Sequence, residues 1–440
     1  MCTILFISLT LRCMPPDSGR GDLPPSSEKV EQKKKSPTEE SSEVPREFVV
    51  SREQVERMKK SVNEGIELAY DVLEEDYENP SEKNKDQELK FHNRTHTEGV
   101  VKRTEKILGA IHGLEEGETP SPETQRVIEL GKLIAAFHDV RNMSRTLEVP
   151  DPVNQGHTKK VRMRARPGFG PVTLDGLRMK QAKSELGGEP LTASDKENLE
   201  ALEELGDLGT NEIDSAKELL AYMKNQVDAE GKPMFTEQDQ ADVQFALAAT
   251  VPGWDVKMGT VDQINLSPSS RELARAVALA DLGEAGMDTE AYMNAADALF
   301  LEDNPDVADA MEHPDKYDDD AKARFAKRIK VWAQIQPGFA LGRMRRLDQE
   351  LEGLTDDEKS RVKEAFNAFG EDEVEVEDVL KDGQPTGQKK IAGLKPGVEP
   401  QGSIGRAFAV SQERAGMSFD ELREQLRVNT AKHKESFVKQ

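Results

Sequence analysis

The sequence predicts an all-α fold, and three observations support this class. Apolar residues recur every three or four positions over several long stretches, as they do on one face of an α-helix. Residues typical of helix starts precede some of these stretches. The chain shows neither the alternation of strands and helices nor the hairpin pattern that would indicate a sheet.

Two helices are expected in the first third of the chain. The first follows Ser51, and a second follows Ser121, a capping residue with Pro122 at the first helical position. Apolar residues of the first helix keep helical spacing: Val55, Met58, Val62, Ile66, Ala69 and Val72. The apolar face of the second is Val127, Leu130, Leu133, Ile134 and Phe137.

Two further helices are expected in the second half of the chain. Ser269 and Glu272 have the spacing of a capping box at the start of an apolar helix. Residues 321–354 form another long helical stretch, which Pro337 is expected to bend because proline removes a backbone hydrogen bond. Residues 142–194, with the run "RARPGFGPV", are expected to be a loop.

The last 85 or so residues give mixed signals. Residues 354–380 predict one helix and a turn, residues 382–403 a linker, and residues 418–437 a final helix. The acidic stretch lacks the aspartate spacing of an EF-hand loop, so calcium binding is not expected. The expected organisation is a disordered tail, a helical domain and a helical C-terminal appendage, with bounds 1–47, 48–355 and 356–440.

Composition narrows the class of function. The chain has 440 residues, of which 33% are charged, and its formal net charge is −24. No basic excess is present to neutralise phosphates, so no nucleic-acid partner is expected. The only cysteines are Cys2 and Cys13, which excludes a disulfide framework or a cysteine metal site in the folded body. A reducing, cytoplasmic compartment is compatible with this usage.

The first fourteen residues are apolar but too short to span a bilayer. They lack a basic start and a clear small-residue cleavage site, so we interpret them as part of a disordered tail. A signal or lipoprotein peptide is the alternative, which would make the protein secreted or membrane-anchored. No other segment approaches membrane length, so no membrane partner is expected.

Histidine is rare, with seven in the chain, and some of its positions indicate a metal site. His92 and His96 stand four residues apart, on one face of an expected helix. His138 and Asp139 end an apolar helix, and Asp281 lies in another. A buried, unpaired carboxylate is costly, and a bound cation removes that cost.

The order of these residues resembles the HD-domain superfamily of metal-dependent phosphohydrolases. The stretch "FHNRTHT" resembles the Tyr-His-Asn-x-x-His signature of the cyclic-nucleotide phosphodiesterase-like branch, with Phe91 at the tyrosine position. The stretches "GTNEIDSA" and "WAQIQPGFALGR" resemble elements of uncharacterised bacterial members. The resemblance covers about residues 50 to 354 and implies an HD-domain helical bundle.

By this resemblance, four residues would hold a divalent cation: His96, His138, Asp139 and Asp281. Zn, Fe, Mn or Mg would suit such a set of ligands. His92 matches the non-ligating histidine, which acts as general acid on the leaving oxygen. The phosphodiesterases carry a further histidine four residues after that of the His-Asp pair, and here this position is Asn142. One metal site is therefore expected, and a second is in doubt.

Several other residues are candidates for substrate contacts. Arg141 and Arg145 follow the His-Asp pair closely and are candidate phosphate ligands. Glu212 is the preferred residue for orienting the attacking water, with Glu218 as its competitor. The basic run "KKVRMRAR" at residues 159–166 would either reach over the site or be a solvated loop. The remaining histidines are expected on the surface: His112, His157, His313 and His433.

The expected function is metal-dependent hydrolysis of a small phosphorylated molecule, a nucleotide monoester or diester. The alternative is a non-catalytic HD-like module that binds a nucleotide or a protein partner and keeps a structural metal. All four ligand positions are intact, which favours the enzyme. The sequence leaves the oligomeric state open.

Overall fold

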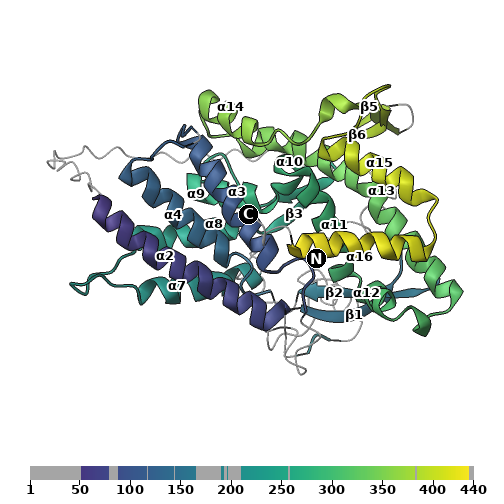
Figure 1. Ribbon diagram of the computed structural model, residues 1–440, viewed down its shortest axis with the longest axis horizontal. Helices are drawn as coiled ribbons and strands as arrows, with labels where there is room; N and C mark the ends of the chain where they lie inside the picture. Colours follow the sequence, from purple (N-terminus) through teal and green to yellow (C-terminus); the bar gives the residue numbers. More distant parts are fainter. Residues whose placement is uncertain are drawn as a thin grey trace.

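The computed structural model describes most of the chain after residue 50. It is mostly helical, which confirms the predicted class, and helices make up its core (Figure 1). The expected tail at 1–47 lies outside the described residues. These are 51–78, 88–115, 117–142, 144–164, 190–192, 196, 210–255, 258–381 and 384–435.

Within the part of the chain that the structure describes, six helices build the region of the core that holds the candidate ligands. Helix α3 packs against α4 and α9, α2 packs against α4, and α8 packs against α7 and α9 (Figure 1). Their bounds are α2 Arg52–Leu73, α3 Arg94–Ile111, α4 Pro122–Phe137, α7 Thr210–Lys224, α8 Glu237–Ala249 and α9 Glu272–Asp281. Helix α2 continues into the short π-helix η1 (Glu74–Glu78).

Caps fix where these helices begin. The Ser51 hydroxyl accepts a hydrogen bond from the backbone of Gln54, and Ser121 caps α4 with Pro122 in the first turn, as predicted. The predicted capping box at Ser269 is wrong. Helix α9 begins at Glu272, because the serines before it hydrogen-bond to one another in a turn.

The second half of the chain forms a layer around a long helix, α13. This helix runs from Asp319 to Glu350 without interruption, with Pro337 inside it. Smaller elements precede and follow it: α10 Glu284–Met287, α11 Thr289–Asp303, α12 Pro305–Glu312, η3 Pro314–Lys316, α14 Asp356–Ala365 and η4 Glu371–Glu373.

The residues after 355 are packed into the body of the molecule. Helix α14 contacts α3, α15 (Ser403–Ala415) contacts α13, and α16 (Phe419–Glu435) contacts α11. Phe366 and Ile404 belong to the main hydrophobic cluster. Leu422 and Leu426 of α16 complete a second cluster with residues of α11 to α13. The expected appendage therefore shares both cores with the rest of the chain.

The described residues form three antiparallel hairpins, although the sequence predicts no strands. They are β1–β2 (Ser144–Pro150, Thr158–Arg164), β3–β4 (Pro252–Asp255, Thr260–Gln263) and β5–β6 (Val374–Lys381, Gln384–Leu394). The expected loop at 142–194 and the expected linker at 382–403 are wrong where these strands lie.

Cross-strand charge pairs explain why the last hairpin was missed. Asp378 pairs with Lys389 at 2.7 Å, and Glu377 pairs with Lys390 at 2.8 Å. The apolar alternation of β5 covers only Val374 to Glu377, and opposite charges that face one another stabilise the strand pair where that alternation ends.

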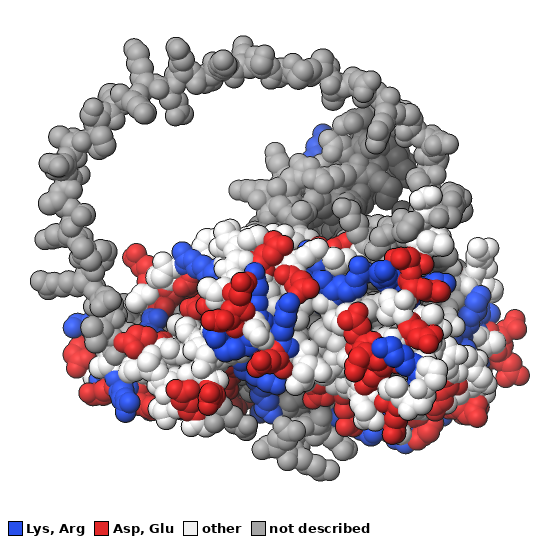
Figure 2. Space-filling model, turned by 90° about the horizontal axis from the view of Figure 1, so that it is seen from above, with Lys and Arg blue, Asp and Glu red and all other residues white. Residues whose placement is uncertain are grey.

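Charges are mixed on the face shown in Figure 2. Acidic and basic side chains alternate over its described part, which carries no continuous basic stripe of the kind that tracks a phosphate backbone. Within the described residues, no helix combines the length and the apolarity needed to cross a bilayer.

Candidate metal centre

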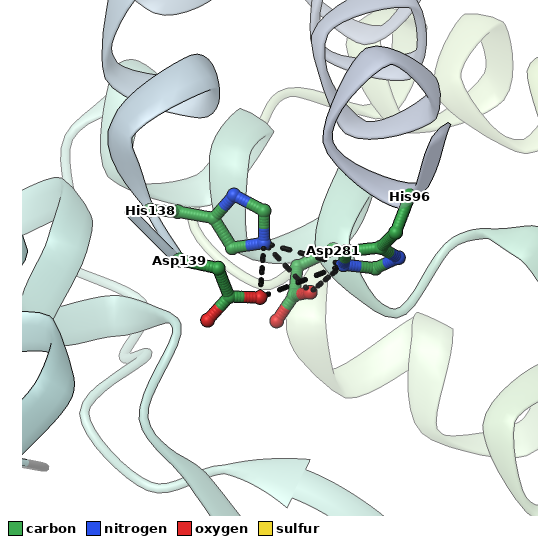
Figure 3. A group of neighbouring side chains, drawn as sticks. All are labelled: His96, His138, Asp139 and Asp281. Carbon is green, nitrogen blue, oxygen red and sulfur yellow. Dashed lines mark hydrogen bonds and ion pairs between the residues drawn. The ribbon is translucent and has the colours of Figure 1, made fainter. Parts of the chain in front are cut away.

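Four side chains from three distant segments converge in the core (Figure 3). They are His96, His138, Asp139 and Asp281, and their candidate ligand atoms all lie within 4.8 Å of one another. The two imidazole Nε2 atoms are 3.3 Å apart. Nε2 of His138 lies 3.0 Å from Asp139 Oδ2 and 3.5 Å from Asp281 Oδ1. The ligand set predicted from the sequence is thus brought together.

Each of the four candidate ligands lies at or next to the end of a helix. His96 lies in the first turn of α3, where the Asn93 side chain accepts a hydrogen bond from its backbone N–H at 3.1 Å. His138 caps the C-terminus of α4, and Asp139 follows it directly. Asp281 is the last residue of α9. Polar side chains can meet here because the backbone leaves the helical path at each of these ends.

Hydrogen bonding fixes the tautomer of His138. Its Nδ1 lies 2.7 Å from the carbonyl oxygen of Ala135, which can only accept, so Nδ1 carries the proton. When the ring is neutral, the lone pair of Nε2 points at the cluster. Burial lowers the pKa of His138, but the carboxylates of Asp139 and Asp281 outweigh it and raise that pKa well above its usual value. The cluster therefore attracts positive charge strongly.

The donor set and its spacing fit a divalent cation. Metal–nitrogen and metal–oxygen bonds of about 2.0–2.2 Å place neighbouring ligand atoms about 3–4 Å apart. The separations between His96 Nε2 and the two carboxylates, 3.4 Å to Asp281 and 3.7 Å to Asp139, fall in that range. Two imidazoles and two carboxylates suit zinc, iron or manganese, and magnesium less well because it prefers oxygen.

A buried carboxylate stands behind His96. Glu284 Oε1 lies 3.9 Å from His96 Nδ1, slightly beyond hydrogen-bond distance, and 3.2 Å from Arg103 Nη1. Burial raises the pKa of Glu284, but the Arg103 charge outweighs this and lowers it to about 2. An ionised carboxylate thus lies next to His96 Nδ1, on the side of the ring that faces away from the other candidate ligands.

His92 is anchored beside the cluster. Its Nδ1 lies 2.5 Å from Glu302 Oε1, and the backbone N–H groups of Phe91 and His92 donate to Glu302 Oε2 at 2.8 and 3.1 Å. The other ring nitrogen, Nε2, lies 4.0 Å from Asp139 Oδ2. One nitrogen of His92 is therefore held from behind while the other faces the candidate ligands.

No family model, no curated protein and no solved structure matches this chain. The likeness to HD-domain proteins consequently depends on the sequence motifs alone. The convergence of the four ligands is a property of this fold, whereas the roles that the resemblance implies stay predictions.

Asn142 occupies the position where the phosphodiesterases carry a further histidine. It is buried, and its Oδ1 accepts a hydrogen bond from Asn211 Nδ2 at 3.0 Å. Its backbone N–H donates to the Tyr77 hydroxyl at 2.9 Å. The side-chain oxygen of Asn142 is therefore engaged by Asn211 in this structure.

Arg141 is engaged by acidic partners. Its guanidinium pairs with Glu218 at 2.8 Å and with Asp76 at 3.2 Å, and its backbone N–H donates to the Ser215 hydroxyl. A phosphate would have to compete with these carboxylates. Glu218 is thereby committed to Arg141, which leaves Glu212 as the better of the two candidates for orienting a water.

Glu212 is buried in the first turn of α7, next to the residue that contacts Asn142. It lies outside the group of four ligands, and its part in catalysis stays a prediction. The side chain of Arg145, in strand β1, lies outside what the structure describes.

The basic run at 159–166 begins in strand β2, which contacts α11. Lys159 is buried, and the charge of Arg162 contributes to the low pKa of Glu302. This part of the run therefore passes behind the anchor of His92.

Sequence reasoning missed three groups around the site: Glu284, Glu302 and His433. His433 was expected on the surface and is buried, so that expectation is wrong. Burial lowers its pKa to about 4, so its ring is neutral near pH 7. A signal did exist: His433 keeps helical spacing with Leu422 and Leu426, which places it on the apolar face of α16. His157 and His313 are exposed, as expected.

The lowered pKa of Glu302 predicts that this residue stabilises the fold in a pH-dependent way. Burial raises its pKa, but the charge and hydrogen bond of His92 outweigh this and lower it from 4.5 to about 2. A depressed carboxyl pKa stabilises the fold above pH 4.5, and that contribution is lost as the pH falls towards 2, up to about 3 kcal/mol. The free energy of unfolding in urea should be measured in the presence of a metal chelator at pH 5 and pH 3. We expect it to fall less between these pH values for Glu302→Gln than for wild type. The surface variant Glu53→Gln should follow wild type, and equal losses in all three would contradict the assignment.

Proposed function

We propose that the protein is a metal-dependent phosphohydrolase acting on a small phosphorylated molecule, a nucleotide monoester or diester. One observation carries the proposal: a complete four-donor cluster lies beside a histidine that a buried carboxylate anchors. A structural metal site needs only the cluster. The anchored His92, with Nε2 turned to the same place, is the additional group that hydrolysis requires.

In this proposal the four candidate ligands bind the cation, and His92 with Glu302 transfers a proton. His96, His138, Asp139 and Asp281 would hold the cation, which when bound supplies Lewis acidity and an activated water near neutral pH. Glu302 keeps the proton on His92 Nδ1, so a second proton on Nε2 makes the ring cationic next to a carboxylate that stabilises it. His92 Nε2 can then donate that proton to the departing alkoxide.

Asp281 and His92 are the groups of the site most open to solvent. The side chains of His96 and His138 are 1% exposed, whereas those of Asp281 and His92 are 18% and 17% exposed. A phosphorylated molecule would therefore approach over Asp281 and His92. This is the side on which a proton donor is useful.

The experiment that tests the proposal pairs a substrate panel with a His92 variant. We expect the wild-type protein, loaded with Mn²⁺, Zn²⁺ or Fe²⁺, to hydrolyse at least one phosphomonoester or phosphodiester. Loss of a general acid costs about 10²–10⁴-fold in rate, so His92→Asn should lower kcat by that factor. Its metal content should equal that of wild type, because His92 is not a ligand. The exposed variant His313→Asn should keep full activity.

The alternative is a non-catalytic binding module with a structural metal, which the near-complete burial of His96, His138 and Asp139 favours. Metal bound at full occupancy, together with no turnover of any phosphoester, would support this reading against the enzyme. An unchanged kcat in His92→Asn would leave hydrolysis standing and remove His92 from it.

A further inference from the structure

Three imidazole rings pack around the single ring of Phe91. The ring centroid of Phe91 lies 4.7 Å from that of His92, 4.4 Å from that of His96 and 5.8 Å from that of His433. Phe91 lies three residues before the start of α3, and its ring packs against both the proposed proton donor and a candidate ligand. The third ring comes from the other end of the chain.

His433 is fixed against Phe91 by two contacts. The two rings are stacked with an interplanar angle of 16°, and His433 hydrogen-bonds to the Phe91 backbone. A ring seated in this way limits the rotamers of Phe91. It also leaves His92 and His96 fewer orientations, because both pack against the same phenyl ring.

Helix α16 itself is firmly attached. Its Asn429 donates to the carboxylate of Asp297 in α11 at 2.7 Å, and the same carboxylate forms a bidentate ion pair with Arg414 of α15 at 2.6 and 2.8 Å. Figure 1 shows α16, in yellow, running along α11 toward the region of α3. His433 is therefore supplied by a helix whose course is set by buried contacts.

We propose that α16 is an integral part of the metal centre and that His433 is a positioning residue, which acts through Phe91 on both His92 and His96. This inference rests on the proposed metal centre. It implies that metal binding and the docking of α16 stabilise each other, because a coupling between two sites is reciprocal.

The test measures metal affinity in full-length protein, using Co²⁺ as the probe. Competition with a chromogenic chelator gives the dissociation constant, and the visible spectrum of the Co²⁺ complex reports the ligand geometry. Loss of outer contacts to ligating histidines costs about 10–100-fold in metal affinity, so we expect a weakening of that size in His433→Ala, with an altered spectrum. His433→Phe, which keeps a stacked ring, should recover most of the affinity. His313→Ala, a histidine removed from the surface, should match wild type.

A second readout follows the coupling in the opposite direction. Amide hydrogen exchange of residues 419–435 should slow when Co²⁺ is added to wild type, and should respond less in His433→Ala. If His433→Ala does not fold, the Co²⁺ affinities of His433→Gln and His433→Phe are compared instead. Glutamine keeps a hydrogen-bond donor but not the ring. We then expect the weaker affinity in His433→Gln.

The outcomes separate the two proposals. If wild type and His433→Ala bind Co²⁺ with the same affinity and the same spectrum, the positioning role is overturned and the metal centre stays intact. Wild type that binds no Co²⁺, Zn²⁺ or Mn²⁺ overturns the metal centre, and the positioning role with it.

Discussion

Replacing His138 and Asp139 together by alanine is expected to abolish metal binding. The change removes two of the four donors that converge within 4.8 Å, and it takes away the carboxylate that lies closest to His138 Nε2 among its acidic partners. Elemental analysis should find about one divalent ion per chain in wild type, as expected for a four-donor site, and none in the double variant. Thermal melting should show that added metal stabilises wild type only.

The control for this experiment removes one histidine and one aspartate from the surface. His313 and Asp320 are exposed, so His313→Ala with Asp320→Ala should keep the full metal content. Asp281→Asn, which keeps the shape of the side chain, tests the same site if the double variant does not fold. A wild-type protein with no more metal than the His138→Ala, Asp139→Ala variant would show that the cluster is not a metal site.

Replacing Arg414 by methionine is expected to destabilise the protein by about 3–5 kcal/mol, because it leaves a buried carboxylate without its counter-ion. Arg414 and Asp297 are both buried, and the guanidinium donates to both carboxylate oxygens. The free energy of unfolding in urea measures the effect. Pairing Arg414→Met with Asp297→Leu should recover most of the loss, since no uncompensated charge is then buried.

The matched control is an ion pair of the same chemistry on the surface. Arg427 and Glu424 lie 2.6 Å apart on α16, and both are exposed to water. Arg427→Met should leave the free energy of unfolding essentially unchanged, because solvent already screens that pair. Equal effects of Arg414→Met and Arg427→Met would show that the Arg414–Asp297 contact does not anchor the C-terminal helices.

The helical elements were largely predictable because their signals are local. The apolar spacing of Val55 to Val72 and the caps Ser51 and Ser121 are written in consecutive residues, and the structure follows them. The hairpins were not predictable in the same way. Strand β5 and its partner β6 carry charged residues that face each other, such as Asp378 and Lys389. That these charges stabilise a hairpin can be recognised only once the two strands are paired.

The candidate ligands were named from the rare histidines, the His-Asp pair and the apolar setting of Asp281, together with the resemblance to HD-domain proteins. Glu284 and Glu302 could not be singled out in this way. The chain has 84 aspartate and glutamate residues, and nothing local marks two of them as neighbours of His96 and His92. Their positions depend on the tertiary fold, which brings Glu284 of α10 next to α3 and Glu302 of α11 next to the residues just before it.

By itself the sequence determined a mostly helical chain, and with its resemblance to HD-domain proteins it predicted two histidines and two aspartates as ligands of a divalent cation. Only the tertiary structure decided which other groups surround that set: Glu302 behind His92, Glu284 behind His96, and His433 against Phe91. The physical reason is the range of the interactions. Helix propensity and capping act over a few residues, whereas the second layer of a metal site is made by packing between segments that lie hundreds of residues apart.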